Sequence, residues 1–481
     1  MTTGMNLWDA EVWSFIITLS LLFMAMFVAN SLRRTNKFIR RLIIPSSVVG
    51  GFILLIANFL CKEFLHFPLY STSTLEILTY HGLGLGFAAL SLRKSEAKKD
   101  KTARREAFNT GVTVVNGYLL QAVSGLAITI ALYYLIGSFY ASGVLLPMGF
   151  GQGPGQAYNW GHNYEVGSWP APFTGGFVHG TSFGLAVAAM GFVSASVGGI
   201  YYLNRLKRKG IFKGQLGENV EEKLTLDTFT GDDEIPLAES LDKFTIQLGL
   251  VFVAYILAYA VMAGINKILD PTGEGATGLA NTIQGMIWGF QFLFSSLCAM
   301  AIKAGMRGLK KAGLMHREYT NDFLQDRISG FMFDMMVVAS IAAIDLKAFT
   351  QPEFLIPLSL ICIVGAFGTY FYLHFVCKYI FPDYEHESFL ALYGMQTGTA
   401  STGVILLREF DPHFETLAAD NIVYHMPWAI LFGAPMFLMV GMAPKSLGHS
   451  FFVMGACAAL FVIFNFILFR KQLRERKAAK K

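Results

Sequence analysis

Long stretches without a single charged residue recur from one end of the chain to the other. A helix crosses the hydrocarbon core of a bilayer with about 20 apolar residues, and these stretches are long enough for that. The pattern therefore predicts a membrane protein built from transmembrane helices, with no soluble domain between them. The uncharged stretches cover residues 12–32, 42–61, 107–164, 166–204, 244–266, 275–302, 354–377, 388–407, 421–444 and 446–469.

The positions of the basic residues predict the orientation of these helices. If the N-terminus lies outside, all but four of the 38 Lys and Arg residues fall in loops or tails on the cytoplasmic side. Basic residues concentrate on that side of membrane proteins, so the asymmetry also places the C-terminus in the cytoplasm. The four exceptions are Lys62, Lys267, Lys347 and Lys445.

This orientation holds only if two uncharged segments enter and leave the membrane on the same face. Residues 138–160 and residues 388–407 are long enough to cross, yet a full crossing of either would move later basic loops outside. We therefore predict two re-entrant hairpins, the first entering from the outside and the second from the cytoplasm. About 11 full spans remain, residues 328–348 among them.

Hairpins of opposite orientation indicate an inverted repeat. The predicted fold class is an all-α polytopic membrane protein with about 11 transmembrane helices and two oppositely oriented re-entrant hairpins. We expect the hairpin tips to meet near the bilayer midplane. The predicted organisation is an N-terminal helix with a basic loop (1–41), a first half (42–203), a cytoplasmic linker (204–243), a second half (244–443), and a C-terminal helix with a basic tail (444–481).

Composition and motifs narrow the class of function. With 54% hydrophobic and 15% charged residues, the chain is too apolar for a soluble globular protein. The net charge of +5 resides in short loops beside apolar spans, so we expect no nucleic-acid partner. The five Cys residues have no CxxC spacing and suggest neither a disulfide nor a metal site. Without a GxxxxGK or HExxH motif, we expect neither ATP coupling nor an enzyme.

The two predicted hairpins carry the polar groups of a candidate binding site. Non-helical backbone at membrane depth has N–H and C=O groups that can serve as ligands for anions and cations. Amide and hydroxyl oxygens suit a hard cation such as sodium, although small residues could instead serve only close helix packing. The candidate substrate ligands are Gln152, Gln156, Asn159, Gln396, Thr397, Thr399, Ser401 and Thr402, of which Thr397, Thr399 and Ser401 are also candidate sodium ligands.

Charged residues extend the candidate set. Asp334 and Asp345 both fall within residues 328–348, where a turn of 100° per residue places them on nearly one helical face. An acid within a span usually faces a cavity, so Asp334 is a candidate cation ligand or proton carrier, and an interfacial position explains it equally well. Lys347 favours an interfacial position for Asp345. Arg408 ends the second hairpin and is either a partner for a substrate carboxylate or a cytoplasmic anchor.

The sequence contains the segments Ile44–Gly51 and Gly82–Arg93 and two Gly-rich hairpins, the second of which includes Tyr393–Pro412. These features resemble the bacterial sodium/glutamate symporter family, and the second hairpin is most similar to its longer-chain branch. The resemblance implies a cytoplasmic-membrane homodimer that couples inward sodium flow to glutamate uptake, with the hairpins in a mobile core beside a helical scaffold. The first hairpin departs from the family's usual sequence between Gly151 and Gln156, which leaves the substrate open.

The sequence thus predicts sodium-coupled symport of glutamate or a related carboxylate, with no cofactor other than the coupling sodium ion. The expected partners are the small anionic substrate, sodium, the lipid bilayer and a second copy of the chain. Two alternatives stay open. One is a symporter of another organic anion driven by sodium, or by protons through Asp334; the other is a membrane receptor or channel without concentrative transport.

Overall fold

The computed structural model describes residues 6–93, 101–212, 242–271, 278–315, 317 and 319–472. Within these ranges every regular element is a helix, and ten helices are long and apolar enough to cross a membrane. The prediction of an all-α polytopic membrane protein is thereby confirmed. The ten segments are Val12–Thr35, Ser46–Leu65, Thr72–Leu92, Lys101–Ile136, Gly180–Arg208, Lys243–Leu269, Gln291–Lys311, Pro352–Ile380, Met426–Lys445 and Leu447–Leu468.

The predicted span 328–348 is not one of the ten. Helix α12 (Asp322–Ala342) carries charged residues along its length and ends before Asp345. The Asp345 side chain accepts the Lys347 N–H at 3.0 Å and caps the short helix η4 (Leu346–Thr350). Aspartate is favoured at such a position because its carboxylate satisfies a first-turn N–H. The expectation that Asp334 and Asp345 share one helical face is therefore wrong.

In several uncharged stretches a helix begins or ends where no charged residue indicates a boundary. Gly137 adopts a φ of 73° directly after α5, a left-handed conformation that ends a helix and that glycine reaches without strain. Residues 107–164 thus contain most of α5 (Lys101–Ile136), η2 (Ser142–Val144), α6 (Leu145–Phe150) and most of α7 (Pro154–Val166). Residues 166–204 form a loop and then α8 (Gly180–Arg208), and residues 275–302 divide at Phe290 between α10 (Gly278–Gly289) and α11 (Gln291–Lys311).

The chain forms two compact units, of which the second comprises Thr72–Glu96 and Glu221–Ala339. It contains α4 (Thr72–Leu92), α9 (Lys243–Leu269), α10, α11 and most of α12. Helices α4 and α9 both pack on α11. The core of this unit is an apolar cluster that includes Leu85, Val251, Ala254 and Ala299.

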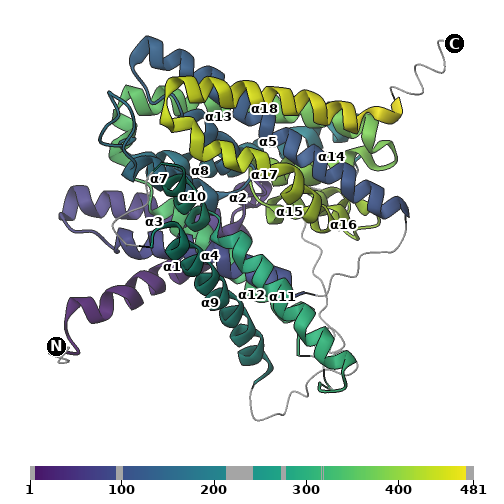
Figure 1. The fold of residues 1–481 in the computed structure, drawn as a ribbon, viewed down its shortest axis with the longest axis horizontal. Helices are drawn as coiled ribbons and strands as arrows, with labels where there is room; N and C mark the ends of the chain where they lie inside the picture. Colours follow the sequence, from purple (N-terminus) through teal and green to yellow (C-terminus); the bar gives the residue numbers. More distant parts are fainter. Residues whose placement is uncertain are drawn as a thin grey trace. The chain divides into compact units, whose positions relative to one another are not determined.

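The first unit comprises Met1–Ser71, Ala97–Val220 and Ser340–Lys481. Within it α5 lies beside α13 (Pro352–Ile380) and α18 (Leu447–Leu468), as Figure 1 shows. Helix α17 (Met426–Met442) packs on α5 as well. A further pair consists of α1 (Ala10–Thr35) and α3 (Ser46–Leu60), with α2 (Lys37–Arg41) between them in sequence and η1 (Cys61–Leu65) after them.

The element order of the first unit contains an internal correspondence. A long helix is followed by two short helices separated by a few non-helical residues, first as α5, α6 and α7. The same order returns as α13, α14 (Glu385–Thr397) and α15 (Ala400–Phe410). This correspondence agrees with an internal duplication. The other short elements are η5 (Pro382–Tyr384), α16 (Leu417–Tyr424) and η6 (Ala443–Lys445).

The predicted cytoplasmic linker, residues 204–243, lies mostly outside the described residues, which omit 213–241. Its basic beginning is helical, because α8 continues to Arg208. Residues 1–5 and 473–481, at the two ends of the predicted terminal segments, are also outside the described ranges. The predicted division of the chain into these segments and two halves stays a prediction.

Candidate functional site

The first predicted hairpin contains a break between two helices. Helix α6 ends at Phe150 and α7 begins at Pro154. Gly153 lies between them with a φ of 83° and a ψ of −178°, a conformation almost restricted to glycine. Proline is well placed at the first position of α7, because an N–H there has no partner within the helix. The Gly-Pro pair thus fixes where α7 begins, and α7 continues to Val166, beyond the predicted end of the hairpin at residue 160.

The second predicted hairpin is broken in a similar way. Helix α14 ends at Thr397 and α15 begins at Ala400. The two helices pack closely at glycines, since a Cβ on Gly394 would lie 2.7 Å from the Cα of Gly403. Thr399 caps α15 by accepting the Thr402 N–H at 3.4 Å. Small and hydroxylated residues thus form the tight helical hairpin itself.

The two breaks lie against each other. A Cβ built on Gly153 would lie 3.3 Å from Thr399 Cγ2 and 3.8 Å from the carbonyl oxygen of Gly398. Gly153 is the N-cap of α7, and Thr399 is the N-cap of α15. The N-terminal ends of two helices therefore come together, each with the partial positive charge of its first turn. This contact agrees with the expected meeting of the hairpin tips.

Helix α5 donates hydrogen bonds to the carbonyl groups beside both breaks. The Tyr118 hydroxyl donates to the carbonyl oxygen of Gly151 at 3.1 Å. One turn further along α5, Gln121 Nε2 donates to the carbonyl oxygen of Gln396 at 3.0 Å and to Thr369 Oγ1 at 2.9 Å. Carbonyl groups at a helix C-terminus have no partner within the helix, so α5 supplies donors to α6 and α14 where each of them ends.

Helix α8 also packs along both hairpins. Gly191 lies against the carbonyl oxygen of Thr397, and a Cβ on Gly191 would lie 3.1 Å from Phe150 Cδ1. Two turns earlier, Gly184 lies against the carbonyl of Ala157 in α7. Residues of α5 and α8 thus contact the ends of α6 and α14, which holds the broken segments inside the protein.

The predicted ligand residues differ in burial. Gln156 and Asn159 in α7 are 1% and 4% exposed, and Gln396, Thr397 and Thr402 are fully buried. Gln152 and Thr399 are half-buried, and Ser401 is exposed. The Thr397 hydroxyl donates to the carbonyl of Tyr393 at 2.6 Å, within its own helix. The structure therefore gathers these residues on the short helices around the breaks, from the interior to the surface.

The structure does not bring Arg408 to the breaks. It lies in the last turn of α15, at the opposite end from Thr399, and its guanidinium carbon is 5.4 Å from the centroid of the Phe414 ring. The rise of 1.5 Å per residue separates Arg408 from Thr399 by about 13 Å along the helix. Asp334 is exposed in α12 and belongs to the second compact unit. The roles of both residues stay predictions.

Helix ends dominate the electrostatics of the breaks. Neither segment 145–164 nor segment 388–407 contains a charged residue. The N-terminal ends of α7 and α15 are partially positive, and the C-terminal ends of α6 and α14 are partially negative. Such an arrangement can hold an anion at the N-terminal ends and a cation at the carbonyl ends, as in transporters with broken helices.

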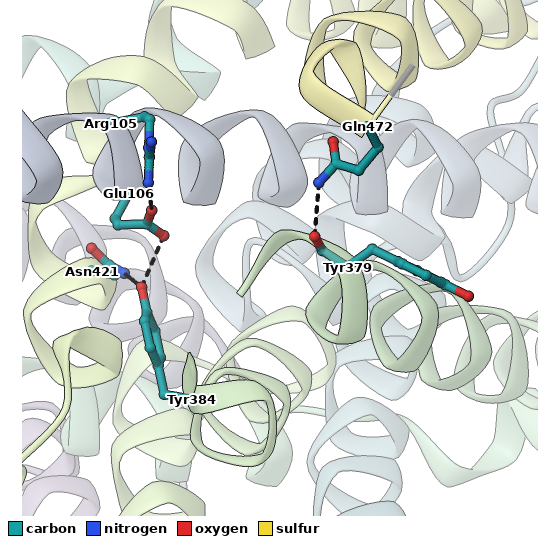
Figure 2. A network of polar contacts seen from close by, with 6 residues as sticks. All are labelled: Arg105, Glu106, Tyr379, Tyr384, Asn421 and Gln472. Atoms are coloured by element: carbon teal, nitrogen blue, oxygen red, sulfur yellow. Dashed lines mark hydrogen bonds and ion pairs between the residues drawn. The ribbon is translucent and has the colours of Figure 1, made fainter. Parts of the chain in front are cut away.

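A second polar network lies where α13 gives way to α14 (Figure 2). Glu106 in α5 is 6% exposed and accepts hydrogen bonds from Arg105 Nη2 at 3.2 Å and from the Tyr384 hydroxyl at 2.9 Å. Asn421 in α16 donates to that hydroxyl at 3.1 Å. Burial, and then the adjacent Glu106, raise the pKa of Tyr384 above its usual range. Tyr384 directly precedes α14, and its protonated hydroxyl therefore links the start of that helix to α5 and α16.

Sequence reasoning predicts a buried hydrogen bond between helices for Gln121, but it missed the other residues that contact the breaks. Gln121 carries a signal, because an amide in an uncharged stretch predicts a hydrogen bond between helices, and the structure confirms such bonds. Tyr118 and Thr369 carry no comparable signal, since aromatic and hydroxyl residues are common in membrane helices. Gly117 and Gly191 are two of 48 glycines, and only packing shows what each one contacts.

No protein-family model matches the chain, and no curated protein matches it significantly.

Proposed function

We propose that this chain is a secondary active transporter that couples inward sodium movement to the uptake of glutamate or a related carboxylate. The observation that carries the proposal is the contact between Gly153 and Thr399, which brings the N-terminal ends of α7 and α15 together. Transporters bind small charged solutes within the membrane at the ends of broken helices. The resemblance of the sequence to the sodium/glutamate symporter family supports the same conclusion.

In this proposal the two helical hairpins re-enter the membrane without crossing it. The basis is the distribution of the 38 Lys and Arg residues, of which all but four fall on one side only under this arrangement. The N-terminus is then outside, the C-terminus is cytoplasmic, and the two halves form an inverted repeat. Non-helical backbone at membrane depth must be buried in protein or line a cavity. The packing of Gly151 on Tyr118 and of Thr397 on Gly191 meets that condition.

The substrate carboxylate binds at the N-terminal ends of α7 and α15. First-turn N–H groups there point out of the helix and favour negative charge. Gln152 and Thr399 supply half-buried polar groups beside these ends, and Gln156 lies one turn into α7. Because the breaks contain no charged side chain, the carboxylate is held by dipoles and hydrogen bonds.

Sodium binds at the carbonyl ends of the broken helices, next to the carboxylate. The two ions have opposite charges and share the elements that hold them, so each raises the affinity for the other by the same factor. This mutual dependence couples the two fluxes. The hairpin-bearing core then moves to expose the site alternately to the two sides, in a cytoplasmic-membrane homodimer, as the family resemblance implies.

The test is uptake of radiolabelled glutamate into proteoliposomes of purified protein. Three conditions are compared: an inward sodium gradient, choline in place of sodium, and a pH gradient alone. Saturable uptake with sodium and none with choline supports the proposal. Uptake that persists in choline and follows the pH gradient would show that protons, and not sodium ions, are the coupling ion. Flux without saturation or counterflow would indicate a channel, and the absence of both sodium-stimulated binding and uptake for a panel of carboxylates contradicts transport.

A further inference from the structure

We propose that the side-chain oxygens of Gln121 in α5 and Gln396 in α14 are ligands of the coupling cation. The site lies between α5 and the C-terminal end of α14. This inference rests on the proposed function, because it presumes a transported cation, and it assigns that cation a position and two specific ligands.

Both amides are buried, and their hydrogen bonds leave the oxygens available. Gln121 is 1% exposed and Gln396 is 0% exposed. Gln121 Nε2 donates to Thr369 and to the Gln396 carbonyl, and Gln396 Nε2 donates to the carbonyl of Thr113 at 3.4 Å. Neither Oε1 atom accepts a hydrogen bond from any described residue. A buried acceptor without a partner is costly, and coordination of a cation would satisfy it.

Gly117 allows the two amides to approach the same part of α5. A Cβ on Gly117 would overlap the Gln396 amide, with Oε1 as its nearest atom. Gln121 follows one turn later on the same face of α5, about 6 Å along the helix axis. The Gln396 carbonyl accepts a bond from Gln121, which fixes the two residues against each other. Both side chains therefore lie at the same face of α5, and the two residues are joined by a direct hydrogen bond.

The surroundings favour a cation over an anion and a metal ion over a proton. Gln396 lies in the last turn of α14, where the partial charge of the helix end is negative. Hard cations take oxygen ligands, including amide and backbone carbonyl oxygens. Carboxamides do not titrate near neutral pH, so these two residues can bind sodium but cannot carry a proton. Gln396 is three residues before Thr399 in sequence, on the other side of the break, so the proposed cation site and the proposed carboxylate site belong to the same hairpin.

The test measures sodium binding to purified protein without substrate, from radioactive sodium and from the sodium concentration that half-maximally raises the thermal unfolding temperature. In Gln121→Leu and Gln396→Leu we expect this concentration to rise at least about tenfold. The matched control is Gln247→Leu, since Gln247 is an equally buried amide in α9 whose oxygen already accepts the Asn321 N–H at 3.0 Å. Sodium dependence should be unchanged in the control.

The outcomes separate this inference from the proposed function. If the wild-type protein shows neither sodium binding nor sodium-driven uptake, the proposed function fails. If the wild type binds sodium and both leucine variants bind it equally well, only the ligand assignment fails. Should either leucine variant not fold, Gln121→Glu and Gln396→Glu preserve the side-chain volume. The added carboxylate should then tighten sodium binding and make it pH-dependent, and sodium binding identical to the wild type at every pH overturns the assignment.

Discussion

Gly153 and Thr399 belong to different broken helices and lie against each other, with no side chain at Gly153 between them. A Cβ there would lie 3.3 Å from Thr399 Cγ2, a distance at which the neighbour must give way. The backbone of Gly153 adds a second requirement, because its φ of 83° and ψ of −178° are open almost only to glycine. One residue therefore determines both where α7 begins and how closely α15 approaches it.

Gly153→Ala is expected to abolish uptake while leaving the protein in the membrane. The strained conformation costs about 1–3 kcal/mol, which α7 can relieve by moving its first turn away from Thr399. The control is Gly137→Ala, which also has a positive φ of 73° but has nothing within 4 Å of a built Cβ. Both variants carry backbone strain, and only the first disturbs the contact between the breaks. Equal loss of uptake in both would show that strain alone is responsible.

Tyr118→Phe is expected to lower the thermal unfolding temperature and to slow uptake. The change removes the hydroxyl that donates to the Gly151 carbonyl and leaves that buried acceptor unsatisfied, at a cost of about 1–3 kcal/mol. Tyr134→Phe is the control on the same helix, since the Tyr134 side chain is 67% exposed. The two variants are compared by unfolding in detergent and by initial uptake rate. If Tyr118→Phe matches the control in unfolding temperature and in uptake rate, the Tyr118 hydroxyl does not support the break.

The distribution of charge predicts the two hairpins, and the structure shows that the helices within them are interrupted at glycine residues. Gly153-Pro154 and Gly398-Thr399 interrupt uncharged stretches with residues that end or begin helices wherever they occur. The side chains around the breaks were harder to predict. Whether Gln396 faces Gly117 depends on how α14 rotates against α5, and one sequence does not specify that rotation.

The distribution of charge predicts a topology, but it does not locate the helix boundaries. Asp345 falls within the predicted span 328–348, yet it serves as the cap of the next short helix. A carboxylate that caps a helix and one that lies within a span look alike in a hydropathy pattern. Arg408 presents a different ambiguity, because it is close to the second break in sequence but lies at the far end of α15.

Arg408→Gln is expected to leave the KM for substrate within about threefold of the wild type. Loss of a direct charge-assisted hydrogen bond to the substrate carboxylate would raise the KM by more than this factor. The guanidinium stacks on Phe414 instead of facing Thr399. Thr399→Val serves as the positive comparison, because it removes the hydroxyl that caps α15 at the break. A rise in KM of more than about tenfold for Arg408→Gln, with normal protein levels, would restore the pairing of Arg408 with substrate.

The network around Glu106 predicts a stabilising role for Tyr384 that does not change with pH in the physiological range. Tyr384→Phe removes the donor to Glu106 and the acceptor for Asn421, so unfolding should become easier by about 1–3 kcal/mol. Tyr379→Phe is the control, because only the backbone carbonyl of Tyr379 takes part, as the acceptor of the Gln472 amide in Figure 2.

The pH dependence of this difference follows from the direction of the pKa shift. Burial and Glu106 raise the pKa of Tyr384 in the folded protein, so the folded state retains the phenolic proton more strongly than the unfolded state. The stabilisation is therefore fully present below the unfolded pKa of about 10 and declines as the pH rises above it. Thermal unfolding of the wild type and Tyr384→Phe from pH 6 to 10.5 should show a constant difference up to about pH 9 that then narrows. A difference that instead changes between pH 6 and 8 would contradict the assignment of the pH dependence to Tyr384.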